Sequence, residues 1–134
     1  MKTYVLDASA LFAFLQNKSG AQKVNGLLKE AVQGRADILM SAVNYGEVYG
    51  SILRAHGSDR TAAAMSAVQP LPIRLVDATP PRACHAADVK TRYKLYYVDS
   101  FAAALAMEYK ATLVTGDTDF RKLGHNLPVL WLKT

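Results

Sequence analysis

The sequence predicts an α/β fold, a three-layer sandwich in which helices flank a mostly parallel central sheet. Short apolar runs typical of strands alternate with segments whose apolar residues recur at helical spacing. Strands separated by helices usually pair in parallel, because the chain crosses back over the sheet between them. The chain has 134 residues, 51% of them hydrophobic and 20% charged. That is enough for one core, so residues 1–134 are expected to form a single domain.

The first half of the chain is predicted to combine strands with amphipathic helices. Strands are expected at residues 2–6 and 37–41, and helices at 8–16, 22–33, 42–56 and 58–69. The second of these helices carries Val24, Leu27 and Leu28 on one face, as a helix packed on a sheet does. Gly57 is expected to end one helix, and Ser58 to cap the N-terminus of the next.

Prolines divide the second half of the chain. Pro70 and Pro72 separate the preceding helix from a strand, and Pro80 and Pro81 stand in the first turn of a long helix, where proline is tolerated. Strands are expected at residues 73–76, 112–115 and 129–132, and further helical segments at 98–110 and 120–123. In parallel sheets of this kind, ligands bind beyond the carboxyl ends of the strands.

The composition indicates a cytoplasmic globular protein. Cys84 is the only cysteine, which excludes an internal disulfide, suits a reducing compartment and predicts a small buried side chain. No apolar run approaches the roughly 20 residues that span a bilayer, so no membrane association is expected. The first residues are strand-like and carry an acid, unlike a signal peptide. The net charge of +5 is compatible with a polyanionic partner.

Four acidic residues occupy positions where burial is expected. Asp7 follows the first strand and Asp117 follows residues 112–115 across one glycine, so both should lie at the carboxyl edge of the sheet. Glu47 lies on a polar stripe of an otherwise apolar helix, and Asp99 stands in the first turn of an alanine-rich helix. Buried carboxylates are costly unless they are paired or hold a metal. A shared cation, and therefore a metal-dependent active site, explains all four together.

Each of these residues also has a purely structural interpretation. Asp7 and Asp99 could be helix caps or first-turn acids. Asp117 and Asp119 could bond their own backbone in a turn. The stripe that runs from Asn44 through Glu47 and Ser51 to Arg54 could be a solvated helix face. The same holds for the mixed basic and aromatic segment at residues 90–97, although such mixtures are also typical of nucleic-acid surfaces. Candidate RNA contacts are Arg54, Lys90, Arg92 and Lys94.

With these residues identified, the sequence resembles the PIN-domain ribonucleases, and among them the VapC-type toxins of toxin–antitoxin pairs. The resemblance covers nearly the whole chain. It rests on VLDASALFAFL, SAVNYGEVYGSIL, the long segment YYVDSFAAALAMEYKATLVTGDTDF and the closing apolar strand. The family's acidic quartet falls on Asp7, Glu47, Asp99 and Asp117, a further acid on Asp119, and supporting hydroxyls on Ser9 and Thr115.

This resemblance implies a PIN-like sandwich and a metal-dependent endoribonuclease. The four principal acids and Asp119 would hold Mg²⁺, or alternatively Mn²⁺, for hydrolysis of RNA phosphodiester bonds. It also implies a homodimer and a cognate antitoxin whose tail covers the acidic groove. Two other classes stay open: a non-catalytic PIN-fold binding module, and an Asp-based phosphotransfer or phosphatase domain with Asp7 as nucleophile. The second lacks the usual acid two residues later, where Ser9 stands.

Overall fold

The computed structural model describes residues 1–133 and contains one five-stranded sheet of order β3-β2-β1-β4-β5. All four pairings are parallel, which confirms the predicted α/β sandwich. The strands are β1 (Lys2–Leu6), β2 (Ala36–Ser41), β3 (Arg74–Val76), β4 (Thr112–Thr115) and β5 (Val129–Trp131). The helices are α1 (Ala8–Leu15), α2 (Ala21–Val32), α3 (Ala42–His56), α4 (Ser58–Val68), α5 (Pro80–Tyr93), α6 (Tyr97–Glu108) and the 3-10 segment η1 (Thr118–Asn126).

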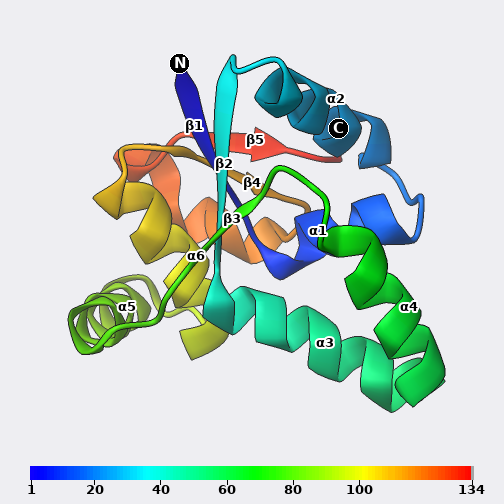
Figure 1. Cartoon of the computed structure of the whole chain (residues 1–134). Helices are drawn as coiled ribbons and strands as arrows, with labels where there is room; N and C mark the ends of the chain where they lie inside the picture. Colours follow the sequence, from blue (N-terminus) through cyan, green and yellow to red (C-terminus); the bar gives the residue numbers. More distant parts are fainter. Residues whose placement is uncertain (134) are drawn as a thin grey trace.

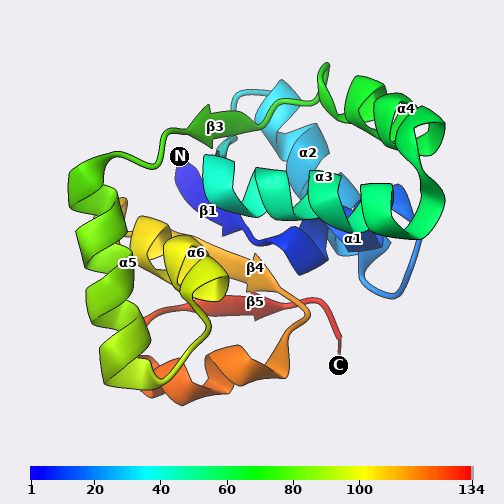
Figure 2. The same ribbon diagram turned by 90° about the horizontal axis from the view of Figure 1, so that it is seen from below.

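Helices cover both faces of the sheet (Figures 1 and 2). Neighbouring residues of a strand point to opposite faces, so Val5 packs with the cluster that contains α5 and α6, while Leu6 packs with α1 and α2. The alanines of α6 let that helix approach the sheet closely, and Ala102, Ala103 and Ala106 are fully buried. The central strand β1 is therefore covered on both sides.

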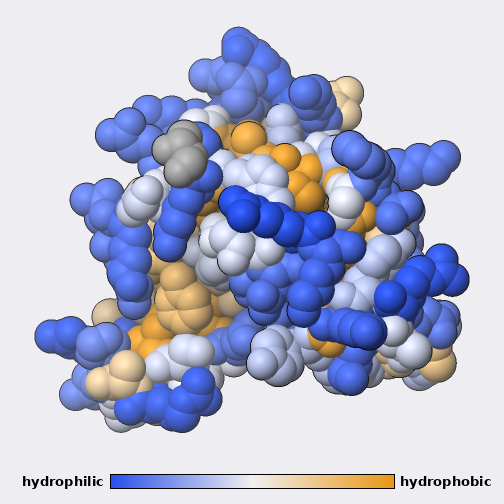
Figure 3. Space-filling view, turned by 180° about the vertical axis from the view of Figure 1, so that it is seen from behind, coloured by the Kyte–Doolittle hydropathy of each residue, from blue (hydrophilic) through white to orange (hydrophobic). Residues whose placement is uncertain are grey.

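The α3–α4 hairpin extends from one end of the sandwich (Figure 1). Val48 and Ile52 of α3 pack with Leu11 of α1, Met40 of β2 and Val68 of α4 in a third apolar cluster. This packing fixes the polar side of α3 next to the N-terminal turn of α1. The face of the molecule drawn in Figure 3 is largely hydrophilic, with hydrophobic residues gathered in separate patches.

The sheet register brings two strand ends together. Leu6 of β1 is paired with Val114 of β4, and the Asp7 amide donates to the Val114 carbonyl at 3.3 Å. Asp7 and the segment after Thr115 consequently lie side by side at the carboxyl edge, as the predicted strand order requires.

Two local predictions are wrong. Ser58 is the first residue of α4 rather than its cap, because Gly57, with a φ of 84°, ends α3 and also precedes α4. Cys84 is exposed rather than buried. Ala86 and Val89 form the buried side of α5, and Cys84 lies on the opposite side of the same helix. Among residues 1–133, no helix combines the length and hydrophobicity needed to cross a membrane.

Gly20 should be intolerant of a side chain, whereas Gly26 should accept one. A Cβ at Gly20 would lie 2.6 Å from Leu132 Cβ, and the φ of this glycine is +90°. Gly20→Ala should therefore lower the free energy of unfolding by more than about 1 kcal/mol. Gly26 lies within α2 with nothing near its Cβ position, so Gly26→Ala should raise that free energy by about 0.5–1 kcal/mol. Urea titration of both variants measures the difference, and equal effects would contradict the Leu132 contact.

Candidate active site

The Asp7 carboxylate is buried and fully hydrogen-bonded. It caps α1 by accepting from the Ala10 amide at 2.9 Å, and it also accepts from Ser9 Oγ at 2.7 Å. Its other oxygen accepts from Thr115 Oγ1. The residue is only 4% exposed. The predicted capping role and the predicted place at the sheet edge thus coincide in one side chain.

The same two hydroxyl groups shape the segment after β4. Ser9 Oγ accepts from the Gly116 amide at 2.9 Å, and Thr115 Oγ1 accepts from the Asp117 amide at 2.9 Å. Asp117 in turn caps η1 by accepting from the Asp119 amide at 2.9 Å. The short turn GDTD is therefore held in place by groups on both β1–α1 and β4.

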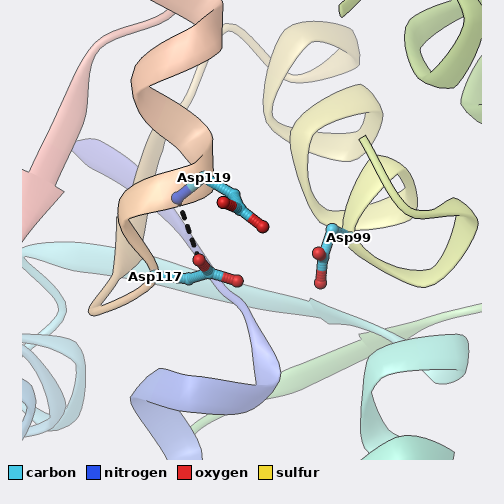
Figure 4. Close-up of side chains that lie close together, drawn as sticks. All are labelled: Asp99, Asp117 and Asp119. Carbon is cyan, nitrogen blue, oxygen red and sulfur yellow. Dashed lines mark hydrogen bonds between the residues drawn. The ribbon is translucent and has the colours of Figure 1, made fainter. Parts of the chain in front are cut away.

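Asp99 reaches this turn from α6. Figure 4 shows the carboxyl groups of Asp99, Asp117 and Asp119 directed toward a common space, and their nearest oxygens lie within 4.8 Å of one another. The first turn of α6 is anchored from α3, because buried Asn44 donates from Nδ2 to the Val98 carbonyl at 3.0 Å. Among the described residues, Asn44 Oδ1 is the buried side-chain atom without a hydrogen-bond partner.

Four of the predicted acids line one pocket of about 190 Å³. Asp7 lies on its floor, and exposed Glu47 lies on its α3 side. The remaining lining residues are Ala8, Ser9, Phe12, Ser51, Asp99 and Asp117. Asp119 does not line this pocket, but it belongs with Asp99 and Asp117 to the group of three close carboxyl groups. We call these five acids the acidic site.

Burial and mutual repulsion raise the pKa values of Asp7, Glu47 and Asp99. Burial raises the pKa of Asp7 to about 6, although the hydrogen bonds from Thr115, Ser9 and Ala10 oppose the rise. Burial also raises the pKa of Asp99, to about 7, with repulsion from Asp117, Glu47, Asp7 and Asp119 adding to it. The pKa of Glu47 is raised by loss of water around its carboxyl group, and Arg54 partly offsets this. Asp99 is thus the acid whose pKa is raised by all four other acids of the site.

This donor set fits a small divalent cation. Carboxylate oxygens are the hard ligands that Mg²⁺ and Mn²⁺ prefer, and a few of them suffice because these ions keep several waters. Asp99, Asp117 and Asp119 are close enough to share one ion. A cation among them would also relieve the repulsion that raises the pKa of Asp99.

The candidate RNA contacts lie in two different places. Arg54 is on the last turn of α3, its guanidinium 3.4 Å from Ser51 Oγ, and its charge acts on Glu47. Lys90 and Arg92 are exposed on the last turn of α5 and do not line the acidic pocket. Lys94 follows α5, and its carbonyl accepts from Lys122 of η1 at 3.0 Å. Only Arg54 acts directly on the acidic site.

Sequence reasoning missed two contributors to this site. Asn44 was assigned to a polar stripe, but it is buried and positions α6. The sequence feature that could have indicated this role is the presence of a polar residue one turn before Glu47 on an otherwise apolar helix. Phe12 stands in the apolar run ALFAFL, where no pattern distinguishes it from its neighbours; it lines the acidic pocket because α1 turns that side toward Glu47 and Ser51.

Comparisons with known proteins agree with this architecture. The sequence model of the PIN domain family matches residues 4–126. Comparison with curated protein sequences finds no match. Among solved structures, VapBC2 from Rickettsia felis bound to a promoter DNA fragment has a TM-score of 0.76 at 16% identity, covering 96% of this chain and 97% of that chain.

Two further structures extend the likeness. FitAcB from Neisseria gonorrhoeae has a TM-score of 0.71 at 17% identity, covering 96% of this chain and 97% of that chain. VapC20 from Mycobacterium tuberculosis, a toxin that cleaves the sarcin–ricin loop, has a TM-score of 0.68 at 18% identity, covering 90% and 95%. At identities this low, the structures share the fold.

The stability of the metal-free protein should fall as the pH rises. The folded-state pKa values of Asp7 and Asp99 are raised from 3.8 to about 6 and about 7. The folded state therefore binds more protons than the unfolded state, and the stability present below the unfolded pKa is lost as the pH passes these values. In chelator, the melting temperature should be about 5 °C lower at pH 8 than at pH 5.

Magnesium should raise the melting temperature at pH 8 and so reverse the loss of stability there. The rise should be smaller at pH 5, where protons compete for the carboxylates. The matched control is the quadruple variant Asp7→Asn, Glu47→Gln, Asp99→Asn and Asp117→Asn. Its melting temperature should fall much less than that of the parent protein between pH 5 and pH 8, and it should not respond to magnesium. A magnesium-induced shift that persists in the quadruple variant would place the ion elsewhere.

Proposed function

The chain belongs to the PIN domain family, and from this premise we propose that it is a metal-dependent endoribonuclease that hydrolyses RNA phosphodiester bonds. The observation that carries the proposal is the convergence of Asp99, Asp117 and Asp119, from two separate segments, beside buried Asp7. Such a cluster destabilises the metal-free protein, which is typical of a site that is built for function.

Asp99, Asp117 and Asp119 would hold the ion, Mg²⁺ or Mn²⁺, with Asp7 and Glu47 on the adjoining sides of the pocket. When bound, the ion supplies positive charge for the phosphate oxygens and activates water for attack on phosphorus. The residues of the chain do the positioning. Ser9 and Thr115 hold Asp7 and the GDTD turn at a fixed separation. Asn44 fixes the start of α6, and with it Asp99.

The electrostatics of the surface favour a polyanionic substrate. The net charge of +5 draws RNA toward a site that would repel it without a cation. Arg54 lies beside Glu47 and is proposed to contact a phosphate near the pocket. Lys90, Arg92 and Lys94 are proposed to contact RNA farther from the scissile bond, because they lie at the end of α5.

A phosphotransfer reaction at Asp7 is less well supported. A carboxylate nucleophile needs a free oxygen that points at the substrate. Both oxygens of Asp7 accept hydrogen bonds, and the residue is 4% exposed. This geometry suits a residue that orients its neighbours and contributes charge.

We further propose that the protein is the toxin of a toxin–antitoxin pair, and that it forms a homodimer. VapBC2 and FitAcB share its fold over nearly the whole chain. Ala8 and Phe12 of α1 supply apolar surface within the acidic pocket, beside Glu47. An amphipathic antitoxin segment could cover these residues and place a basic side chain among the acids.

Removal of single carboxylates should strongly slow RNA cleavage without unfolding the protein. Asp7→Asn, Glu47→Gln, Asp99→Asn and Asp117→Asn should each lower the rate on the order of 100-fold in excess magnesium, because each removes charge from the site. Asp119→Asn should be milder. Asp88→Asn, on the exposed side of α5, is the matched control. If Asp99→Asn cleaves RNA as fast as the parent protein, the site assignment is wrong.

Expression of the active protein alone should arrest growth, and a co-expressed small protein from the neighbouring gene should relieve the arrest. The Asp99→Asn variant should be harmless but should still retain that small protein in a pull-down, because the substitution leaves the apolar residues beside the acidic site, Ala8 and Phe12, unchanged. Harmless expression of the active protein, with no retained partner, would exclude the toxin role and leave the nuclease proposal standing.

A further inference from the structure

A second pocket opens directly beside the acidic pocket. It has a volume of about 310 Å³ and shares three lining residues with the acidic pocket: Ser9, Phe12 and Asp117. Phe12 thus forms part of the wall between them. A ligand that reaches from one pocket into the other would pass this aromatic ring.

The walls of the second pocket combine an apolar floor with a basic rim. Ala13 and Leu132 are buried and supply apolar surface. Lys18, Ser19 and Lys133 are exposed and line the opening. Asp117, on the side shared with the acidic pocket, is the only acid in the lining. A flat apolar group between two anionic groups would match this arrangement of surfaces.

Hydrogen bonds and close packing fix the walls of the second pocket. The Leu132 amide donates to the Thr115 carbonyl at 3.0 Å, and Gly20 packs against Leu132 so closely that no side chain fits between them. Lys23 Nζ donates to the Trp131 carbonyl at 2.8 Å, which ties α2 to β5. The Lys18 amide donates to the Ala13 carbonyl at 2.9 Å.

We propose that this second pocket, the base pocket, binds one unstacked nucleobase of the RNA next to the phosphodiester held at the acidic site. The face of Phe12 contacts the base, and Lys18 and Lys133 contact flanking phosphates. The inference rests on the proposed ribonuclease function and adds to it a subsite that requires one unstacked base beside the acidic pocket. In an RNA duplex the bases are stacked and cannot enter a pocket of this kind, whereas loops and single strands expose them to aromatic side chains.

Binding of a fluorescent, unstructured RNA of about 12 nucleotides tests the basic rim. The Asp99→Asn chain is used so that the RNA stays intact, and the double substitution Lys18→Ala and Lys133→Ala is added to it. Loss of two phosphate contacts should weaken binding on the order of tenfold and reduce the slope of log K against log salt by about 1.4. The control is the double substitution Lys2→Ala with Lys29→Ala, which removes the same charge. Both lysines are exposed and lie away from the carboxyl edge of the sheet, Lys2 at the start of β1 and Lys29 in the last turn of α2.

Two further variants test the pocket itself. Ser19→Trp should fill the opening, and Phe12→Leu should keep apolar packing while removing the aromatic face. Loss of one stacked base should weaken RNA binding about fivefold or more. In the otherwise unsubstituted protein, both changes should also flatten the base preference next to the cut. The magnesium-induced rise in melting temperature should persist in both variants and show that the acidic site is intact.

The outcomes separate this inference from the proposed function. If the parent protein cleaves RNA but the Lys18 and Lys133 variant binds like the control variant, the base pocket is overturned and the nuclease survives; a peptide segment of a partner would then be the better occupant. If the Lys18 and Lys133 variant loses affinity while no condition yields cleavage, the base pocket stands and the nuclease proposal fails. Unchanged binding and base preference in Ser19→Trp would also overturn the base pocket.

Discussion

The hydrogen bonds that two hydroxyl groups make around the buried Asp7 carboxylate determine the geometry of the acidic site. Ser9 and Thr115 each donate to Asp7, and each accepts from a backbone amide of the segment after β4. The ends of β1 and β4 are therefore joined through one carboxylate rather than merely placed side by side by the sheet. A buried polar network of this kind is stable only when every member has its partners. The positions of Asp117 and Asp119 depend on it, as does the shared wall between the acidic pocket and the base pocket.

The same burial leaves the carboxylates of the acidic site poorly solvated and repelling one another, and the fold alone does not relieve this. Asp7 keeps its hydrogen bonds yet has its pKa raised to about 6, so loss of water outweighs three donors. Asp99, with no hydrogen-bond donor among the causes of its shift, is raised further, to about 7, by burial and four neighbouring acids. The acids that lower the stability of the metal-free protein are thus the same groups that favour the binding of positive charge. Either a metal ion or a basic side chain from a partner could supply that charge, so the same acids could serve both the proposed catalysis and the proposed inhibition.

Much of the fold follows from local patterns in the sequence. Residues 42–56 and 112–115 form the predicted helix and strand with the predicted bounds, because apolar periodicity and turn residues agree there. Asp7 and Asp117 lie at the same edge of the sheet because each follows the carboxyl end of a parallel strand. Features that depend on which side of a helix faces the core were not predictable from spacing alone: Cys84 lies on the solvent side of α5, and Asn44 is buried. The place of Phe12 between two pockets depends on packing among α1, α3 and the segment after β4, which no local pattern encodes.

The sheet order also governs when the site can exist during synthesis of the chain. β1 is made first but lies at the centre of the sheet, and its neighbour β4 comes more than a hundred residues later; the hydrogen bond between Thr115 and Asp7 spans 108 positions. Contacts this distant in sequence form late in folding. A nascent chain on the ribosome therefore carries Asp7, Glu47 and Asp99 without the turn that brings the acids together, and its acidic site stays incomplete until residues 112–119 have emerged. If the proposed ribonuclease activity holds, this order of assembly separates the making of the first acids of the site from the appearance of activity.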